Sequence, residues 1–198
     1  MNSNDHCVRV FISWSGERSR RVAELLTCWL KCVVNAVEPW VSTEDIVKGS
    51  PWFTEIGGQL KRSPVGILCL TRENMNAPWI LFEAGALANG SPKSRVCPLL
   101  IDLRPSELKG PLASFNATTP TQKDMFNLVS TINKTLAIHA LPEHILRLTF
   151  DSLWPLFRNG FRSAAHRDKG KLGLRRAKAR DMPMSACRPL GGSGGASF

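Results

Sequence analysis

One acidic residue stands alone in the middle of the chain. Between Glu73 and Lys93 the only charged side chain is Glu83, and the surrounding run from Pro78 to Ala88 is apolar and typical of a helix. A carboxylate on an apolar helix loses hydration and is driven toward protonation unless a partner or a ligand uses its charge. Glu83 is therefore a candidate for chemistry, although a capping or ion-paired structural role would also explain an isolated glutamate.

The length and composition favour one globular domain. The chain has 198 residues, of which 43% are hydrophobic and 21% are charged, so it can bury a full core. No apolar run approaches the roughly 20 residues that cross a bilayer, and the polar opening is not typical of a secretory leader. We expect a cytoplasmic protein with no membrane partner.

The cysteines show no pattern of a metal site or a disulfide framework. No close CxxC pair occurs, and although Cys28 and Cys32 could share a helix face, no nearby histidine completes a ligand set with them. We expect reduced and mostly buried thiols, and no metal. The six cysteines are Cys7, Cys28, Cys32, Cys69, Cys97 and Cys187.

The positive charge is concentrated at the C-terminal end. Of the formal net charge of +10, residues 162–198 carry +7, from 9 Lys and Arg against 2 Asp, and residues 1–161 carry +3. The segment 162–198 is rich in Gly, Pro and Ser, and we expect it to be a disordered tail. Its cations can attract phosphates, but without interleaved aromatic residues they offer no platform for bases, so no specific nucleic-acid partner is expected.

The hydrophobic pattern alternates between strands and helices. Short runs typical of strands occur at residues 8–13, 37–41, 65–70 and 96–101, with a fifth at 112–116, and the run at 65–70 is continuously apolar. Pro39 in the second run suggests an edge or a bulge. Helical spacing is found at residues 17–34, 52–60, 78–88, 121–137 and 142–161. This order predicts an α/β fold, a parallel sheet with helices on both faces. Such sheets bind ligands beyond the carboxyl ends of their strands.

Four short segments in this order resemble the Toll/interleukin-1 receptor (TIR) domain in its prokaryotic form. They are VFISWS at 10–15, WVS at 40–42 followed by Asp45, GILCLT at 66–71, and APW at 77–79 with Glu83 four residues after Trp79. The resemblance covers residues 7–140, and it implies a flavodoxin-like sheet of five parallel strands. Residues 141–161 would then form a helical extension, ahead of the basic tail at 162–198.

The resemblance also implies an activity. In the catalytic branch of the TIR family, a glutamate four residues after a tryptophan cleaves the bond between nicotinamide and ribose in NAD+, and Trp79 and Glu83 match those positions. Nicotinamide leaves as a neutral molecule while the ribose approaches an oxocarbenium ion, so one carboxylate suits the chemistry. NAD+ is then the substrate, and no cofactor or metal is required.

The substrate-binding residues implied by the resemblance lie in two loops and on the Glu83 helix. The loop after the first strand supplies an aromatic residue that can stack on a base, and the loop from residue 42 corresponds to the family's mobile BB loop, which shapes the pocket and contacts neighbouring subunits. These residues are Ser13, Trp14, Ser15, Ser42, Asp45, Trp52 and Trp79.

The chain departs from the family at two positions in these loops. Animal enzymes of the family often carry basic residues where Ser15 and Asp45 stand. Phosphate contacts would then come from backbone amides, from Lys48 or Arg18, or from a neighbouring chain. Trp14 and Trp52 are also explained by a protein interface.

Other function classes lack their motifs. A receiver domain needs an aspartate at the end of the third strand, where Leu70 and Thr71 stand, and neither a GxGxxG turn nor a phosphate-binding GxxxxGK[ST] loop occurs. The remaining rival is a non-enzymatic TIR scaffold that acts through TIR–TIR assembly. The Trp-to-Glu spacing favours the enzyme, with ADP-ribose or a cyclic isomer as product. The biological role of such an enzyme would be antiphage defence or virulence. Its trigger would be self-association or a separate sensor protein.

Overall fold

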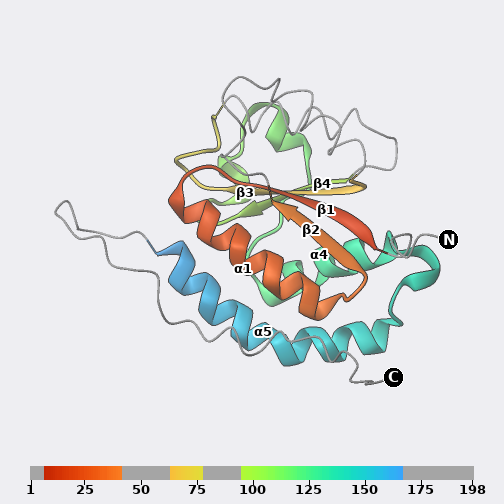
Figure 1. Cartoon of the computed structure of the whole chain (residues 1–198). Coiled ribbons are helices and arrows are strands. Elements are labelled where there is room, and N and C mark those ends of the chain that lie inside the picture. The colour runs from red at the N-terminus through yellow and green to blue at the C-terminus, as the bar shows by residue number, and fades with distance from the viewer. Residues whose placement is uncertain (1–6, 42–62, 78–94, 167–198) are drawn as a thin grey trace, which may run out of the picture. The chain divides into compact units, whose positions relative to one another are not determined.

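Four parallel strands form the sheet that organises the molecule. The computed structural model describes residues 7–41, 63–77 and 95–166, and in that part of the chain the strand order is β2-β1-β3-β4 (Figure 1). The strands are β1 (Val8–Ser13), β2 (Val37–Val41), β3 (Val65–Leu70) and β4 (Arg95–Leu100). Every neighbouring pair is parallel. The expected α/β class with a parallel sheet is confirmed.

The apolar strand sequences arise because both faces of the sheet are covered. Successive side chains of a strand point to opposite faces. In β3, Ile67 joins one hydrophobic cluster and Leu68 joins the other, and both are fully buried. Pro39 in β2 is consistent with the strand order, because a proline that cannot donate to the ladder indicates an edge or a bulge, and β2 is an edge strand in the described part of the chain.

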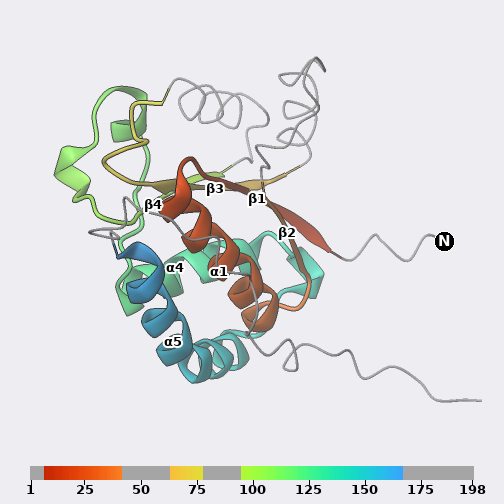
Figure 2. The same cartoon turned by 60° about the vertical axis from the view of Figure 1, so that its left-hand side comes forward.

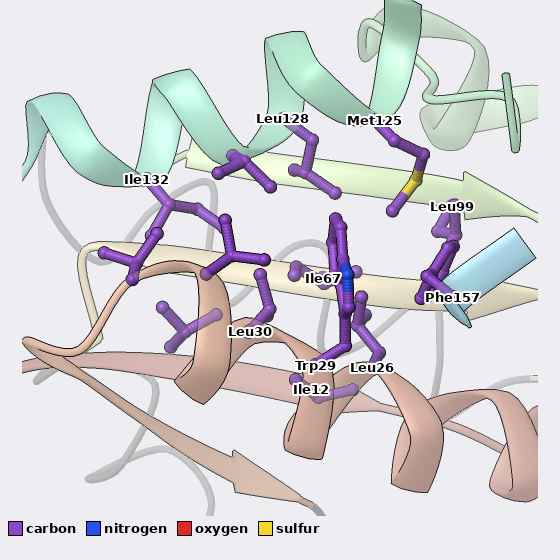
Figure 3. Packing of buried hydrophobic residues seen from close by; sticks show 14 of the residues in the cluster. Ile12, Leu26, Trp29, Leu30, Ile67, Leu99, Met125, Leu128, Ile132 and Phe157 are labelled. Carbon is purple, nitrogen blue, oxygen red and sulfur yellow. The ribbon is translucent and has the colours of Figure 1, made fainter. Parts of the chain in front are cut away.

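Three helices lie on one face of the sheet: α1 (Glu17–Val33), α4 (Gln122–Lys134) and α5 (Glu143–Ala165) (Figures 1 and 2). Their apolar faces form the main core with Ile12, Ile67 and Leu99, which Figure 3 shows between α1 and α4. Trp29 of α1 is central, because its ring centroid lies 4.4 Å from that of Phe157 on α5. Trp29, which is 4% exposed, is therefore a core residue.

The other face carries a smaller cluster. Phe11, Leu68, Leu70 and Leu100 of the sheet contact apolar residues from the segment 103–115. This segment contains two short 3₁₀ helices, η1 (Pro105–Glu107) and η2 (Gly110–Ser114). The segment 103–115 therefore covers part of this face of the sheet, next to β4.

The prediction of a fifth strand at residues 112–116 is wrong. Gly110 has a φ of 60°, and Pro111 follows at the start of η2, where its fixed φ and missing N–H favour a turn over a ladder. Pairing beside β4 is reduced to one parallel bridge between Leu99 and Thr118. The Thr118 amide donates to the Pro98 carbonyl over 2.7 Å.

The predicted helices agree with the described ones to within a few residues. The C-terminal helix continues to Ala165, four residues beyond the expected end, and the 3₁₀ helix η3 (Ala137–His139) precedes it. The helices predicted at 52–60 and 78–88, and the tail from residue 167, lie outside the described residues. Within the described ranges, no helix has the length and apolar character that a membrane span requires.

Candidate functional site

The carboxyl ends of β1, β3 and β4 meet at one edge of the sheet. Because these strands are parallel and adjacent, the segments that follow them, residues 13–16, 71–77 and 101–104, begin side by side. The Ile101 amide donates to the Leu70 carbonyl over 2.9 Å at this edge. Parallel sheets bind their ligands here. We refer to these three segments as the carboxyl edge.

Five of the predicted site residues lie outside the described part of the chain. They are Ser42, Asp45, Trp52, Trp79 and Glu83. Their roles stay predictions. The structure instead shows how the carboxyl edge, from which the Trp79–Glu83 segment continues along the chain, is built.

The other three predicted residues lie at the carboxyl edge, where Ser13 is the last residue of β1 and Trp14 and Ser15 follow it. Ser13 is fully buried, and Trp14 is 8% exposed and packs in the main core. Among the described residues, the buried Trp14 Nε1 atom has no hydrogen-bond partner. A buried indole N–H usually has one. A stacking role for Trp14 stays a prediction. The indole N–H is the polar group through which this ring could donate a hydrogen bond.

Ser15 and Gly16 form the turn between β1 and α1. Gly16 has a φ of 82°, in the region that favours glycine, and precedes the first residue of the helix. No side chain caps the helix from Gly16. Instead the Ser19 hydroxyl donates to the Ser15 carbonyl and accepts from the Ser15 amide at 3.0 Å. One hydroxyl thus fixes the turn that carries Trp14.

Asn74 lies at the centre of the carboxyl edge. Its side chain is buried, and its Nδ2 atom lies within hydrogen-bond distance of the Ser15 carbonyl (3.0 Å), the Cys69 carbonyl (3.0 Å) and the Ser19 hydroxyl (3.2 Å). Its Oδ1 accepts from the Thr71 amide at 2.8 Å. The carboxamide therefore links the turn after β1, the first turn of α1 and the segment after β3.

A charged cluster of Arg18, Glu73 and Asp102 lies at the same edge. Arg18 Nη1 donates to Asp102 Oδ2 over 2.6 Å, and Arg18 Nη2 lies 3.1 Å from Glu73 Oε1 in an ion pair outside hydrogen-bond geometry. The other oxygen of Asp102 accepts from the Arg72 amide at 2.9 Å. Asp102 thus joins the end of β4 to the start of α1 and to the segment after β3.

Arg18 was one of the expected sources of a phosphate contact, but two carboxylates already surround its guanidinium. Its side chain is 8% exposed, and both carboxylates are within ion-pair distance. A phosphate would have to approach these negative groups. The structure therefore favours a structural role for Arg18, as the link between α1 and the ends of β3 and β4.

The cysteines differ in exposure from the expectation of mostly buried thiols. Cys69 is buried, and burial raises its pKa to about 12, while burial raises the pKa of Cys97 to about 11. Cys7, Cys28 and Cys32 are exposed, which corrects the prediction for these three. The helix face that Cys28 and Cys32 share points to solvent because the opposite face of α1 supplies the core. A thiol with a pKa near 12 is not a nucleophile at neutral pH.

A cleft of about 530 Å³ lies away from the carboxyl edge. It is lined by the start of β4, the segment 114–118 and α4, and includes Arg95, Asp124 and Thr131. Because β4 begins at Arg95, this cleft is at the amino end of the strand. It is therefore not the crevice in which parallel sheets hold ligands.

Sequence reasoning missed Asn74 and Asp102. Both are polar residues in the segments that follow β3 and β4, and polar residues in such segments can serve the carboxyl edge. No local pattern identifies their partners, because the Asn74–Ser15 contact spans 59 positions and the Arg18–Asp102 contact spans 84.

Comparison with known families agrees with this architecture. The sequence profile of the TIR domain matches residues 10–130, more than half of the chain. The chain belongs to the TIR domain family. In this TIR domain the matched residues run from β1 into α4, so α5 follows the match. No curated protein sequence matches the chain.

Proposed function

We propose that this TIR domain protein is an NAD+ hydrolase that cleaves the nicotinamide–ribose bond with Glu83. The observation that carries the proposal is the Trp79-to-Glu83 spacing in a TIR domain, on the segment that follows β3. The TIR family includes NAD-cleaving enzymes. Segment 71–77, which leads to Trp79 and Glu83, is anchored by Asn74 and Asp102 at the carboxyl edge, and this supports a site there.

The chemistry requires one negative group near the ribose. As the bond to nicotinamide lengthens, positive charge develops on the anomeric carbon, and a carboxylate stabilises it more than it stabilises the bound substrate. Nicotinamide leaves as a neutral base, so no general acid is required. Water then captures the ribosyl cation to give ADP-ribose, or a nucleophilic adenine nitrogen captures it to give a cyclic isomer.

The biological role that fits this activity is antiphage defence, in which NAD+ loss or a cyclic nucleotide signal arrests an infected cell. TIR domains commonly assemble with one another. In this proposal, self-association or a separate sensor protein completes the pocket and switches on the enzyme.

The proposal is tested by nicotinamide release from NAD+ at high protein concentration, with and without a crowding agent, followed by chromatography. Glu83→Gln removes the charge and keeps the shape, so we expect a fall on the order of a thousandfold in rate. Glu143→Gln, at an exposed position in the first turn of α5, serves as the control and should cleave NAD+ at the parent rate. Assembly by parent and Glu83→Gln alike, with no release by either, would favour the scaffold.

A further inference from the structure

We infer that Asn74 is a positioning residue for the reaction: its buried carboxamide fixes the segment that leads to Trp79 and Glu83, so its loss lowers turnover more than substrate binding. The inference rests on the proposed function and extends it to a residue outside the Trp–Glu motif. It arises from the hydrogen bonds that converge on one side chain.

Both polar atoms of the Asn74 carboxamide have hydrogen-bond partners. Its two N–H donors are shared among three acceptors, and its carbonyl oxygen accepts from the Thr71 amide. The Asn74 backbone amide also donates to the Thr71 hydroxyl, at 3.3 Å. Since Asn74 is 3% exposed, water does not replace these partners. A buried polar side chain whose polar atoms all have partners holds its neighbours in one arrangement.

The partners of Asn74 belong to rigid elements. Cys69 lies in β3, the fully buried central strand, and Ser19 lies in the first turn of α1, which packs on the sheet. The segment 71–77 is therefore fixed at both β3 and α1. Ala77, whose amide donates to the Asn74 carbonyl over 2.8 Å, is two residues before Trp79 and six before Glu83.

The charged cluster acts on the same segment but is a weaker positioning device. Glu73 is 51% exposed and Asp102 is 28% exposed, so water screens and competes with their contacts to Arg18. Asn74 is buried, so water does not compete for its hydrogen bonds. We therefore assign the main positioning role to Asn74.

Asn133 offers a matched control. It is also a buried asparagine, 6% exposed, and it also bridges backbone groups: its Nδ2 donates to the Leu141 carbonyl over 2.8 Å and its Oδ1 accepts from the Leu141 amide at 2.9 Å. It lies near the end of α4 and fixes the connection to α5, not the carboxyl edge. A change at Asn133 reproduces the structural loss without touching the proposed site.

The test compares Asn74→Asp with Asn133→Asp. Each substitution keeps the size and the acceptor but replaces the N–H donors with a carboxylate that faces backbone carbonyls. Both variants should melt at lower temperature than the parent. At a temperature where both are folded by near-ultraviolet circular dichroism, we expect kcat of Asn74→Asp to fall about 10- to 100-fold with KM nearly unchanged, because a displacement of about 1 Å costs rates of that size. Asn133→Asp should keep the parent kcat.

A milder variant covers the case in which Asn74→Asp does not fold. Ser19→Ala removes one acceptor of Asn74 and keeps the other two, so a smaller fall in kcat at constant KM is expected. Parent-like kcat for the folded Asn74→Asp, or for Ser19→Ala if Asn74→Asp is unfolded, overturns the positioning role and leaves the proposed function standing. Absence of nicotinamide release from the parent and from Glu83→Gln alike overturns both.

Discussion

At the scale of single residues, the carboxyl edge is held by polar side chains that satisfy backbone groups. Ser19 bonds the amide and the carbonyl of Ser15, Asn74 bonds two backbone carbonyls, and Asp102 accepts from the Arg72 amide. Strand ends leave such groups unpaired, and burying them without partners is costly. These residues let three strands end at the same edge and still form an ordered surface.

Glu107, the last residue of η1, is another carboxylate that bonds a backbone amide near the carboxyl edge. The Arg104 amide donates to its carboxylate over 2.8 Å, and the guanidinium of Arg72 lies 2.7 Å away. The backbone hydrogen bond, with the nearby arginines, lowers the pKa of Glu107. The ionised carboxylate is therefore the form that the fold favours.

The pH dependence of stability should report this carboxylate. A lowered folded pKa contributes stability that is fully present above the unfolded value of about 4.3 and is lost as the pH falls through the folded value. We expect Glu107→Gln to melt at a lower temperature than the parent near pH 7, with the difference shrinking near pH 3. Thermal melts at both pH values check this. A constant difference would assign the effect to packing instead.

At the scale of elements, α5 belongs to the same core as the family-matched part of the chain. Its buried residues Phe150 and Phe157 contact Trp29 of α1, and the Trp29 Nε1 donates to the Leu153 carbonyl over 3.3 Å. The exposed face of α5 carries large apolar residues as well, with Leu148 67% and Leu156 69% exposed. Residues 10–130 alone would thus leave the outer face of α1 uncovered.

A pair of neighbouring substitutions tests the role of α5. Phe157→Ala removes a fully buried ring and should cost about 3–5 kcal/mol in the free energy of unfolding. Leu156→Ala changes the adjacent, exposed position and should stay within about 0.5 kcal/mol of the parent. Chemical denaturation measures both values. Equal effects would contradict the burial of α5 against α1.

At the scale of the whole molecule, the charge is divided along the chain. Residues 162–198 carry +7 of the formal +10. The described residues pair many of their cations with carboxylates, as in the Arg20 contacts to Glu17 and Glu24. Attraction to polyphosphates should therefore depend on the C-terminal residues, and it should be independent of NAD+ cleavage.

Neutralising four of these cations tests this separation. Replacing Arg175, Arg176, Lys178 and Arg180 together with Gln changes the formal net charge from +10 to +6. The full-length variant should elute from a heparin column at lower salt than the parent, because fewer counterions are released on binding. Nicotinamide release should be unchanged. A loss of release would instead place the basic residues in the activity.

The sequence by itself determined the four described strands, the described α-helices and the family, because apolar periodicity is a local property and the TIR motifs are short. It predicted the parallel sheet, and Pro39 indicated an edge or a bulge at β2, which is an edge strand in the described part of the chain. It failed at 112–116, where Gly110 and Pro111 favour a 3₁₀ turn over strand pairing. Only the tertiary structure decided which polar groups meet at the carboxyl edge. Asn74 and Ser15 are 59 positions apart in the sequence, yet they are hydrogen-bonded. Folding brings the ends of adjacent strands together, and no local sequence pattern predicts such a contact.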